Sequence, residues 1–174
     1  SNLGTNAFGQ GLAVTPLQMI TAVATVANGG TRLRPHVVDR RVNPDGTASK
    51  FRPVVEAQVI SPQTAQMVTD IMVRTVEEDV PQARVDGYRI AGKTGTAQIP
   101  IPGGYDPERT IASFVGFGPV SDPQLIILVK LDRPATSQWG GETAGPTFRR
   151  LASRLFAILG IPPDGRMEAA VAGG

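Results

Sequence analysis

One short segment of the sequence, residues 87–98, carries the side chains best suited to chemistry. It reads GYRIAGKTGTAQ, and Lys93, Thr94 and Thr96 lie within four residues of one another. An ammonium group beside two hydroxyls is a set of hydrogen-bond donors that suits an anion, either a phosphate or a carboxylate. The segment therefore raises two hypotheses, which differ in the backbone that must present the lysine.

The first hypothesis is a phosphate-binding loop, because residues 87–94 match the pattern G-x-x-x-x-G-K-[ST]. Such a loop needs a helix that begins at the lysine and points its N–H groups at the phosphate. Residues 94–104 contain two prolines and three glycines, which a helix does not accommodate. Upstream, residues 84–89 are too polar for the buried parallel strand that the motif needs. The context disfavours a nucleotide-binding protein.

The second hypothesis places Lys93 on a strand. Three strands are predicted, at 89–98, 111–118 and 124–131, and the short link 119–123 favours an antiparallel hairpin. On such a strand the Lys93 ammonium attracts a carboxylate and the threonine hydroxyls donate hydrogen bonds to it. Gly95 lets a substrate backbone approach the strand closely, and the N–H of Thr96 faces a developing oxyanion.

Helix signals occur at three places. Thr15, Pro16 and Gln18 form the start of a helix that ends at Asn28-Gly29, and its almost uniformly apolar or small residues predict burial on all sides. A second helix begins at Ser61-Pro62.

A third helix is predicted from Pro146 to Gly160, with Phe148, Leu151, Leu155 and Ile158 or Leu159 facing inward. Between the first two helices, the turn sequence NPDG at 43–46 separates two short extended segments. The fold class predicted is α+β, with helices packed on an antiparallel sheet.

Composition excludes several classes of function. The chain has no cysteine and a single histidine, His36, so we expect neither a metal site nor a Ser-His-Asp triad. A net charge of +2 without a long basic run gives no reason to expect nucleic acid as a partner. No cofactor is expected, and no segment is long and apolar enough for a transmembrane helix.

Several motifs, in a fixed order, resemble those of class B penicillin-binding proteins. They cover the chain from about Ala7 to about Pro163: GQGLAVTPLQM at 9–19, ANGG at 27–30 with Pro35 following, AGKTGTAQ at 91–98, SFVGFGP at 113–119 and GGETAGPTF at 140–148. The resemblance implies the C-terminal part of a penicillin-binding-protein/β-lactamase-like transpeptidase fold. It implies a serine D,D-transpeptidase that cross-links peptidoglycan stem peptides and is acylated by β-lactam antibiotics.

On the family pattern, Lys93, Thr94, Gly95 and Thr96 bind the substrate, and Lys93 also assists proton transfer. Gln98 and Tyr105 are candidates for the rim of the substrate groove, with a plain surface loop as the alternative for Tyr105. Trp139 is expected to pack and not to recognise a ligand. The family also implies the extracytoplasmic face of a bacterial membrane, an upstream anchor and a peptidoglycan glycosyltransferase as neighbour.

The sequence departs from the family in one respect. In the family, the nucleophilic serine lies in a Ser-x-x-Lys motif, and a second motif is Ser-x-Asn. In this chain the residues three places before the lysines are Thr47, Ile90 and Ile127, so Ser-x-x-Lys is missing. No asparagine has Ser two places earlier, so Ser-x-Asn is missing as well. We therefore expect residues 1–163 to be a partial transpeptidase domain, inactive alone, that lacks its N-terminal part. Residues 164–174 are expected to form a disordered tail.

Two further expectations concern partners and relatives. The strand at 124–131 has an open edge in the absence of the rest of the domain, so we expect association of copies through it. A non-catalytic penicillin sensor and a serine β-lactamase remain as alternatives. The sensor would still need a serine, and the β-lactamase would not be expected to show the motifs at 9–19.

Overall fold

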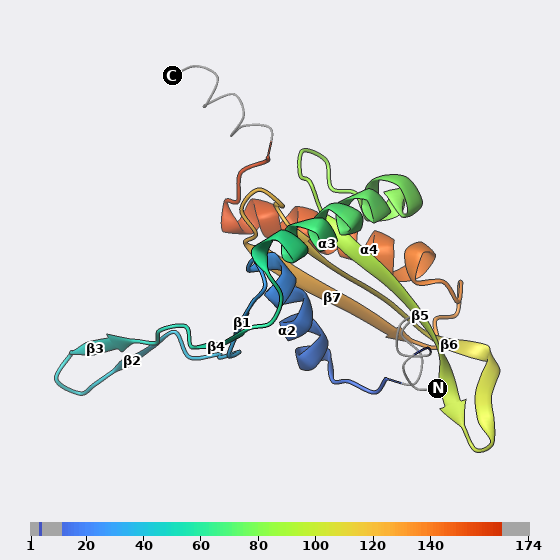
Figure 1. The fold of residues 1–174 in the computed structure, drawn as a ribbon, viewed down its shortest axis with the longest axis horizontal. Coiled ribbons are helices and arrows are strands. Elements are labelled where there is room, and N and C mark those ends of the chain that lie inside the picture. Colours follow the sequence, from blue (N-terminus) through green and yellow to red (C-terminus); the bar gives the residue numbers. More distant parts are fainter. Residues whose placement is uncertain (1–3, 5–11, 165–174) are drawn as a thin grey trace.

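The structure, a computed structural model, describes Gly4 and residues 12–164. The GQG part of the first family motif therefore lies outside the described residues. The described elements, drawn in Figure 1, are α2 (Pro16–Ala27), β1 (Thr31–Leu33), β2 (Arg40–Val42), β3 (Ala48–Lys50), β4 (Val55–Gln58), α3 (Pro62–Arg74), the π-helical turn η1 (Thr75–Asp79), the 3₁₀ turn η2 (Pro81–Ala83), β5 (Ala91–Ile101), β6 (Gly104–Gly118), β7 (Leu125–Asp132) and α4 (Gly140–Leu159).

The central sheet is antiparallel, with strand order β5-β6-β7. Lys93 on β5 lies opposite Val115 on β6, and Val115 lies opposite Leu128 on β7. Both connections are hairpins, since two residues separate β5 from β6 and six separate β6 from β7. The α+β prediction and the antiparallel hairpin are confirmed.

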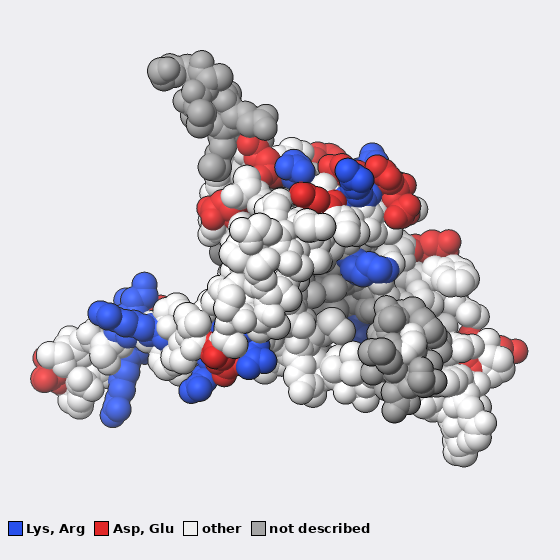
Figure 2. Space-filling model, viewed as in Figure 1, with Lys and Arg blue, Asp and Glu red and all other residues white. Residues whose placement is uncertain are grey.

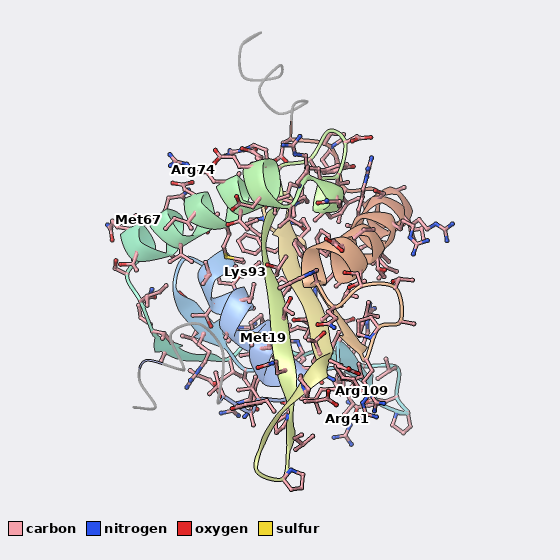
Figure 3. All side chains as sticks on the ribbon, turned by 90° about the vertical axis from the view of Figure 1, so that its right-hand side faces the viewer. Met19, Arg41, Met67, Arg74, Lys93 and Arg109 are labelled. Atoms are coloured by element: carbon pink, nitrogen blue, oxygen red, sulfur yellow. The ribbon has the colours of Figure 1, made fainter. Side chains whose placement is uncertain are left out.

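Helices cover both faces of this sheet because its strands carry apolar residues on both sides. Phe114 and Val129 belong to the core under α4, where the ring of Phe148 lies 4.7 Å from that of Phe114. Ala91 and Phe117 belong to a second core. That second core is formed with Met72 and Val73 of α3 and with Val23 and Val26 of α2. Figure 3 shows the sheet between α2 and α3 on one side and α4 on the other.

Helix α2 begins as the sequence predicted. The Thr15 N–H donates to Oε1 of Gln18 at 2.8 Å, and the Gln18 N–H donates to Oγ1 of Thr15 at 3.2 Å, which closes the capping box. The prediction of burial on all sides is wrong: only Thr25 is buried, and Leu17 is 59% exposed. The helix contacts β1, α3 and strands β6 and β7 of the central sheet, and side chains such as Leu17 face away from these elements.

Helix α4 begins six residues earlier than predicted, so that Pro146 lies inside it. A proline removes one helix hydrogen bond, and contacts outside the helix offset that loss. Oγ of Ser137 donates to Oε2 of Glu142 at 2.5 Å, and the Gly140 N–H donates to Oγ1 of Thr96 at 3.1 Å. Sequence periodicity could not reveal the second bond because its partners are far apart in the chain.

The buried row of α4 also differs from the prediction. Phe148 faces inward as expected, but Leu151 is exposed and Leu155 only partly buried. Ile158 and Leu159 are also exposed, so neither faces inward. The residues that complete the buried row are Ala144, Ala152 and Phe156, each four residues from the next buried one. Alanines at these positions let the helix approach the sheet closely, which a leucine row would not allow.

The segment between α2 and α3 forms two small antiparallel sheets, β1-β4 and β2-β3. At the other end of the chain, Asp164 is the first residue of the expected tail and is bound to the domain. Its carboxylate accepts hydrogen bonds from the Arg89 N–H and from Ser121 Oγ, and its N–H donates to the Gly87 carbonyl at 3.1 Å. Residues 165–174 lie outside the described residues.

Candidate active site

Lys93 lies within β5, the edge strand of the central sheet (Figure 3). Strand β5 continues for eight residues beyond Lys93, to Ile101, so no helix begins at the lysine. A phosphate-binding loop requires that helix, and it requires a parallel sheet that is absent from the described residues. The structure therefore excludes a phosphate-binding loop at Lys93 and agrees with the strand predicted there.

The side chains of Lys93, Thr94 and Thr96 form a small cluster of donors, which we call the β5 cradle. Nζ of Lys93 donates to the Thr94 carbonyl oxygen at 2.9 Å and lies 3.3 Å from Thr94 Oγ1, which accepts from it. Oγ1 of Thr96 accepts from the Gly140 N–H at 3.1 Å. Each hydroxyl already accepts a hydrogen bond, so its own hydrogen is free to donate to a ligand.

Position on the strand explains why the two threonines act together. Side chains alternate along a strand, so Thr94, Thr96 and Gln98 project to the same face. Lys93 is exposed, Thr94 is partly buried and Thr96 is exposed. The cradle is thus open to solvent at the edge of the sheet, and its ammonium and hydroxyl donors suit an anion.

Two glycines allow the start of α4 to touch β5. A Cβ atom on Gly140 would lie 2.4 Å from the Ser113 carbonyl oxygen and 2.5 Å from that of Gly95. A Cβ atom on Gly95 would lie 2.5 Å from Oγ of Ser113. Side chains at either position would separate the helix and the two strands, and the Gly140–Thr96 hydrogen bond depends on their close approach.

The two predicted rim residues lie at different distances from the cradle. Gln98 is exposed and only two residues along β5 from Thr96, so it continues the same row. Tyr105 lies in strand β6 and not in a loop, opposite Pro100. Pro100 is seven residues from Lys93, or roughly 20 Å along an extended strand. The structure does not bring Tyr105 to the cradle.

Trp139 and Gly140 are the residues at this site that sequence reasoning missed. Trp139 was expected to pack, but it is 61% exposed and directly precedes the first residue of α4. Its neighbour Gly140 supplies the N–H that holds Thr96. The paired glycines 140–141 after an aromatic residue were the available signal, since a glycine pair marks a close backbone approach.

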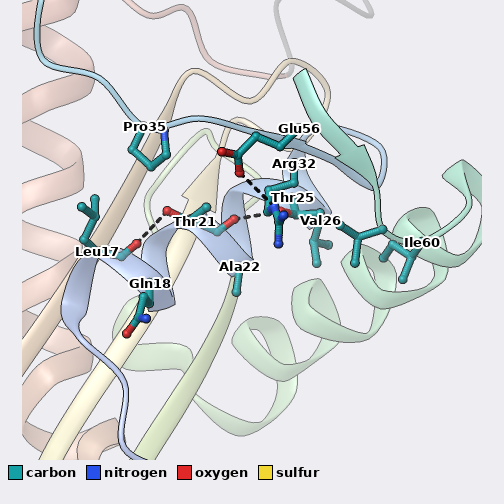
Figure 4. Close-up of a pocket in the computed structure, with 11 residues that line it drawn as sticks. Leu17, Gln18, Thr21, Ala22, Thr25, Val26, Arg32, Pro35, Glu56 and Ile60 are labelled. Atoms are coloured by element: carbon teal, nitrogen blue, oxygen red, sulfur yellow. Dashed lines mark hydrogen bonds and ion pairs between the residues drawn. The ribbon is translucent and has the colours of Figure 1, made fainter. Parts of the chain in front are cut away.

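A separate groove occurs elsewhere in the described part of the chain. It has a volume of about 700 Å³ and lies between α2 and the β1-β4 sheet, as Figure 4 shows. Its lining is mainly apolar, with Leu17, Val26 and Ile60, and an ion pair of 3.1 Å joins Arg32 to Glu56 at its border. It contains no residue of the cradle.

Two other features, a metal-binding group and a membrane-spanning helix, are absent from residues 12–164. No group of three or more His, Asp or Glu side chains gathers there in an arrangement that could hold a metal ion. No described helix combines the length and the apolar composition that crossing a membrane would require.

Comparison with known proteins assigns a family. Residues 1–153 match the model of the penicillin binding protein transpeptidase domain. Among curated proteins, the chain is 39% identical over 163 residues to stage V sporulation protein D of Bacillus subtilis and 37% identical over 171 residues to penicillin-binding protein PbpB of Mycolicibacterium smegmatis. These alignments cover 91% and 90% of the chain but only 25% and 26% of the relatives.

Solved structures agree with this assignment. Penicillin-binding protein 3 of Mycobacterium tuberculosis superposes with a TM-score of 0.79 at 35% identity, over 89% of this chain and 37% of that one. The transpeptidase domain of Burkholderia pseudomallei penicillin-binding protein 3 gives a TM-score of 0.75 at 31% identity, over 92% and 47%. Fold, cradle and comparisons together place the chain in the penicillin-binding protein transpeptidase family. It spans about a quarter of the length of the curated relatives it matches.

Proposed function

We propose that this chain is the C-terminal part of the transpeptidase domain of a peptidoglycan D,D-transpeptidase. Relatives at 32–34% identity are named as such enzymes, in Mesostigma viride and, as a probable one, in Neisseria flavescens. The structural match of the M. tuberculosis protein extends to its complex with ampicillin, also at a TM-score of 0.79. These names support acyl transfer on peptidoglycan stem peptides, and sensitivity to β-lactam antibiotics, as the reaction class of the whole protein.

The observation that carries the proposal is the state of the two cradle hydroxyls. Thr94 and Thr96 both accept a hydrogen bond from within the protein, so both present a hydrogen to the ligand. With the Lys93 ammonium they offer hydrogen-bond donors, which suit the terminal carboxylate of a D-Ala-D-Ala peptide or the carboxylate of a penicillin. The first turn of α4, which meets Thr96 at Gly140, adds positive potential there.

The backbone of β5 supports a second role at the same edge. The Thr94 carbonyl accepts from Lys93 and so faces the open edge of the strand. Backbone groups two residues apart point to the same side of a strand, so the Thr96 N–H faces that edge as well. We assign it to the oxyanion that forms when a serine attacks the penultimate D-Ala carbonyl.

The nucleophile has to come from the part of the domain upstream of this chain. In the proposed reaction the serine oxygen bonds to the carbonyl carbon, its proton passes to a base, and the terminal D-Ala leaves as an amine. An amine of a second stem peptide then displaces the serine. Since no Ser-x-x-Lys occurs in the 174 residues, the chain alone is expected to form no acyl-enzyme.

The setting of the whole protein is part of the same proposal. Stem peptides are cross-linked outside the cytoplasmic membrane, so we place the cradle on the extracytoplasmic face, held there by a segment upstream. The upstream part of the domain then supplies a strand to the open edge of β7, and a peptidoglycan glycosyltransferase supplies the strands to be joined.

Covalent labelling with a fluorescent penicillin tests the proposal. The product of the complete reading frame should be labelled, and the 174-residue chain should not. In the complete protein, Lys93→Ala should reduce labelling by at least about tenfold, since a hydrogen bond to a charged group contributes roughly 1.5–3 kcal/mol. Lys130→Ala is the matched control, because Lys130 is also exposed and pairs only with the nearby Asp132. Labelling of the chain alone, or equal labelling of the two variants, would contradict it.

A further inference from the structure

The hairpin formed by β2 and β3 projects away from the rest of the chain. Figure 1 shows it at the far end of a thin stalk, and every residue of both strands is exposed. Within residues 12–164, β2 contacts only β3, and no other helix or strand touches either of them. An isolated hairpin is marginally stable in water, and packing within residues 12–164 does not explain it. We call residues 36–54 the arm.

The arm carries more positive than negative charges, and its strands are exposed. Residues 36–54 carry four cations and two carboxylates, and Figure 2 shows Lys and Arg side chains gathered there. Arg40 is directly opposite Lys50 in the hairpin register. Like charges at opposed positions destabilise a strand pair, and the exposed ion pair of Arg40 with its neighbour Asp39 contributes little against that. The opposed cations therefore destabilise the hairpin when it is alone, but they favour the binding of an anion.

The register also shows which backbone groups are free. The Asn43 N–H donates to the Thr47 carbonyl and the Phe51 N–H to the Asp39 carbonyl, so residues 39, 41 and 43 make the hairpin's own hydrogen bonds. Bonded and non-bonded pairs alternate in an antiparallel ladder. The N–H and C=O groups of Arg40 and Val42 therefore point outward, toward the open edge of β2.

Side chains on one face of the arm form a cationic row followed by an apolar row. Arg40 and Lys50 form a cationic row, and the next row on that face is Val42 opposite Ala48. Val42 is 63% exposed, and a hairpin surrounded by water does not require an apolar side chain at this position. A strand lying along β2 would meet a cationic position and, two residues further on, an apolar one.

We propose that the arm is a docking strand for an acidic, extended segment of a partner protein. The segment adds to the open edge of β2 through backbone hydrogen bonds, with a carboxylate beside Arg40 and an apolar side chain beside Val42. Lys50, the cross-strand neighbour of Arg40, adds positive charge at the same position. This inference is independent of the reaction that the β5 cradle performs. An anionic membrane would bind the cations of the arm. It would not pair with the outward backbone groups of β2 or distinguish the two-residue spacing between the cationic and the apolar position.

Selection from a displayed library of random ten-residue peptides tests this on the 174-residue chain. The enriched peptides should be rich in Asp and Glu, with an apolar residue two places from an acidic one. The charge-reversed chain R40E/K50E should bind them at least about tenfold more weakly and should enrich Lys and Arg instead. R74E/R150E is the matched control, since Arg74 and Arg150 are exposed residues of α3 and α4. It should behave as the parent chain does.

Backbone N-methylation of an enriched peptide tests strand addition itself. Methylation at one set of alternate residues removes the N–H groups that face β2 and should abolish binding, whereas methylation at the other set should leave it intact. The proposal is overturned if no peptide is enriched, if the peptides show no acidic excess, or if both methylated sets bind equally. It is also overturned if phosphatidylglycerol vesicles bind the chain through Arg40 and Lys50 while peptides do not.

Discussion

At the scale of single residues, the hydrogen-bond state of two hydroxyls decides what the β5 cradle can bind. A threonine hydroxyl in solution can donate or accept, so it does not by itself select for a carboxylate. The Gly140 N–H occupies the acceptor side of Thr96 at 3.1 Å, and the Lys93 ammonium lies 3.3 Å from Thr94 Oγ1. Each hydroxyl therefore has its hydrogen available for a ligand that accepts hydrogen bonds.

Substitution at Thr96 tests this account in the complete protein. Thr96→Val keeps the shape and removes the donor, so the second-order rate of acylation by penicillin should fall about 10- to 100-fold, as the loss of one hydrogen bond to a charged group implies. Thr96→Ser keeps the donor and should stay within about threefold of the parent. Stopped-flow kinetics with a fluorescent penicillin measures both rates. A loss in Thr96→Ser without one in Thr96→Val would show that the methyl group, not the hydroxyl, matters.

Gly140 offers a test that needs only the 174-residue chain. In Gly140→Ala the new methyl group meets two backbone oxygens, at 2.4 and 2.5 Å, and backbone cannot move aside as a flexible side chain can. Overpacking of this kind should lower the free energy of unfolding by about 1–3 kcal/mol. Urea denaturation followed by circular dichroism measures the change.

The neighbouring Gly141 is the control for that substitution. Its Cβ atom would lie 3.5 Å from Val80 Cγ1 and 3.7 Å from Thr94 Cγ2, which are ordinary contacts. Gly141→Ala should therefore leave the free energy of unfolding unchanged or raise it by up to about 1 kcal/mol, since alanine suits a helix better than glycine. If both alanines destabilise equally, the close approach of α4 to β5 is not the cause.

At the scale of elements, helix α2 is fixed at its start by local hydrogen bonds and not by burial. Thr15→Ala removes one half of the capping box and should lower the free energy of unfolding by about 1 kcal/mol. Thr21→Ala removes a hydroxyl that donates to the Leu17 carbonyl inside the helix, and it should change stability by less than about 0.5 kcal/mol. Thermal unfolding of the two variants distinguishes a cap from an ordinary helical threonine.

The turn of the β2-β3 hairpin should respond to acid. The Thr47 hydroxyl and N–H both donate to Oδ1 of Asp45, at 2.7 and 2.9 Å, and these bonds lower the pKa of Asp45 below its usual 3.8. A carboxyl group with a lowered pKa in the folded turn stabilises it at pH values above 3.8, and that contribution is lost as the pH falls through the folded pKa.

The amide NMR signal of Thr47 should therefore titrate at a pH below 3.8. In Asp45→Asn the side chain keeps an acceptor but cannot titrate, so the Thr47 signal should stay constant over the same range. A titration midpoint above 3.8 would show that the Thr47 bonds do not favour the ionised group.

At the scale of the whole molecule, the central sheet has two open edges. Strand β5 carries the cradle at one edge, and β7 pairs with β6 only, so its other side is unpaired in the described structure. Residues 125–129 read LIILV, and open apolar edges promote association between copies. The isolated chain should form dimers or larger species, so its mass by light scattering should rise with protein concentration. A mass that stays monomeric at all concentrations would contradict this.

The sequence by itself determined the local parts of this protein. Thr15, Pro16 and Gln18 specify the start of α2 because a capping box involves neighbours in the chain. Prolines and glycines after Lys93 exclude a helix and leave a strand. The short link after β6 requires an antiparallel partner. The order of the motifs then indicated the family to which the comparisons assign the chain.

Only the tertiary structure decided how distant parts meet. The bond between Gly140 and Thr96 joins residues 44 positions apart, and it extends α4 to a start that helix signals alone did not predict. Exposure of α2 and of Trp139 likewise depends on which elements cover them, a property that apolar composition does not encode. Local hydrogen-bond patterns are fixed by neighbouring residues, whereas burial and the geometry of the cradle arise from contacts between separate elements of the chain.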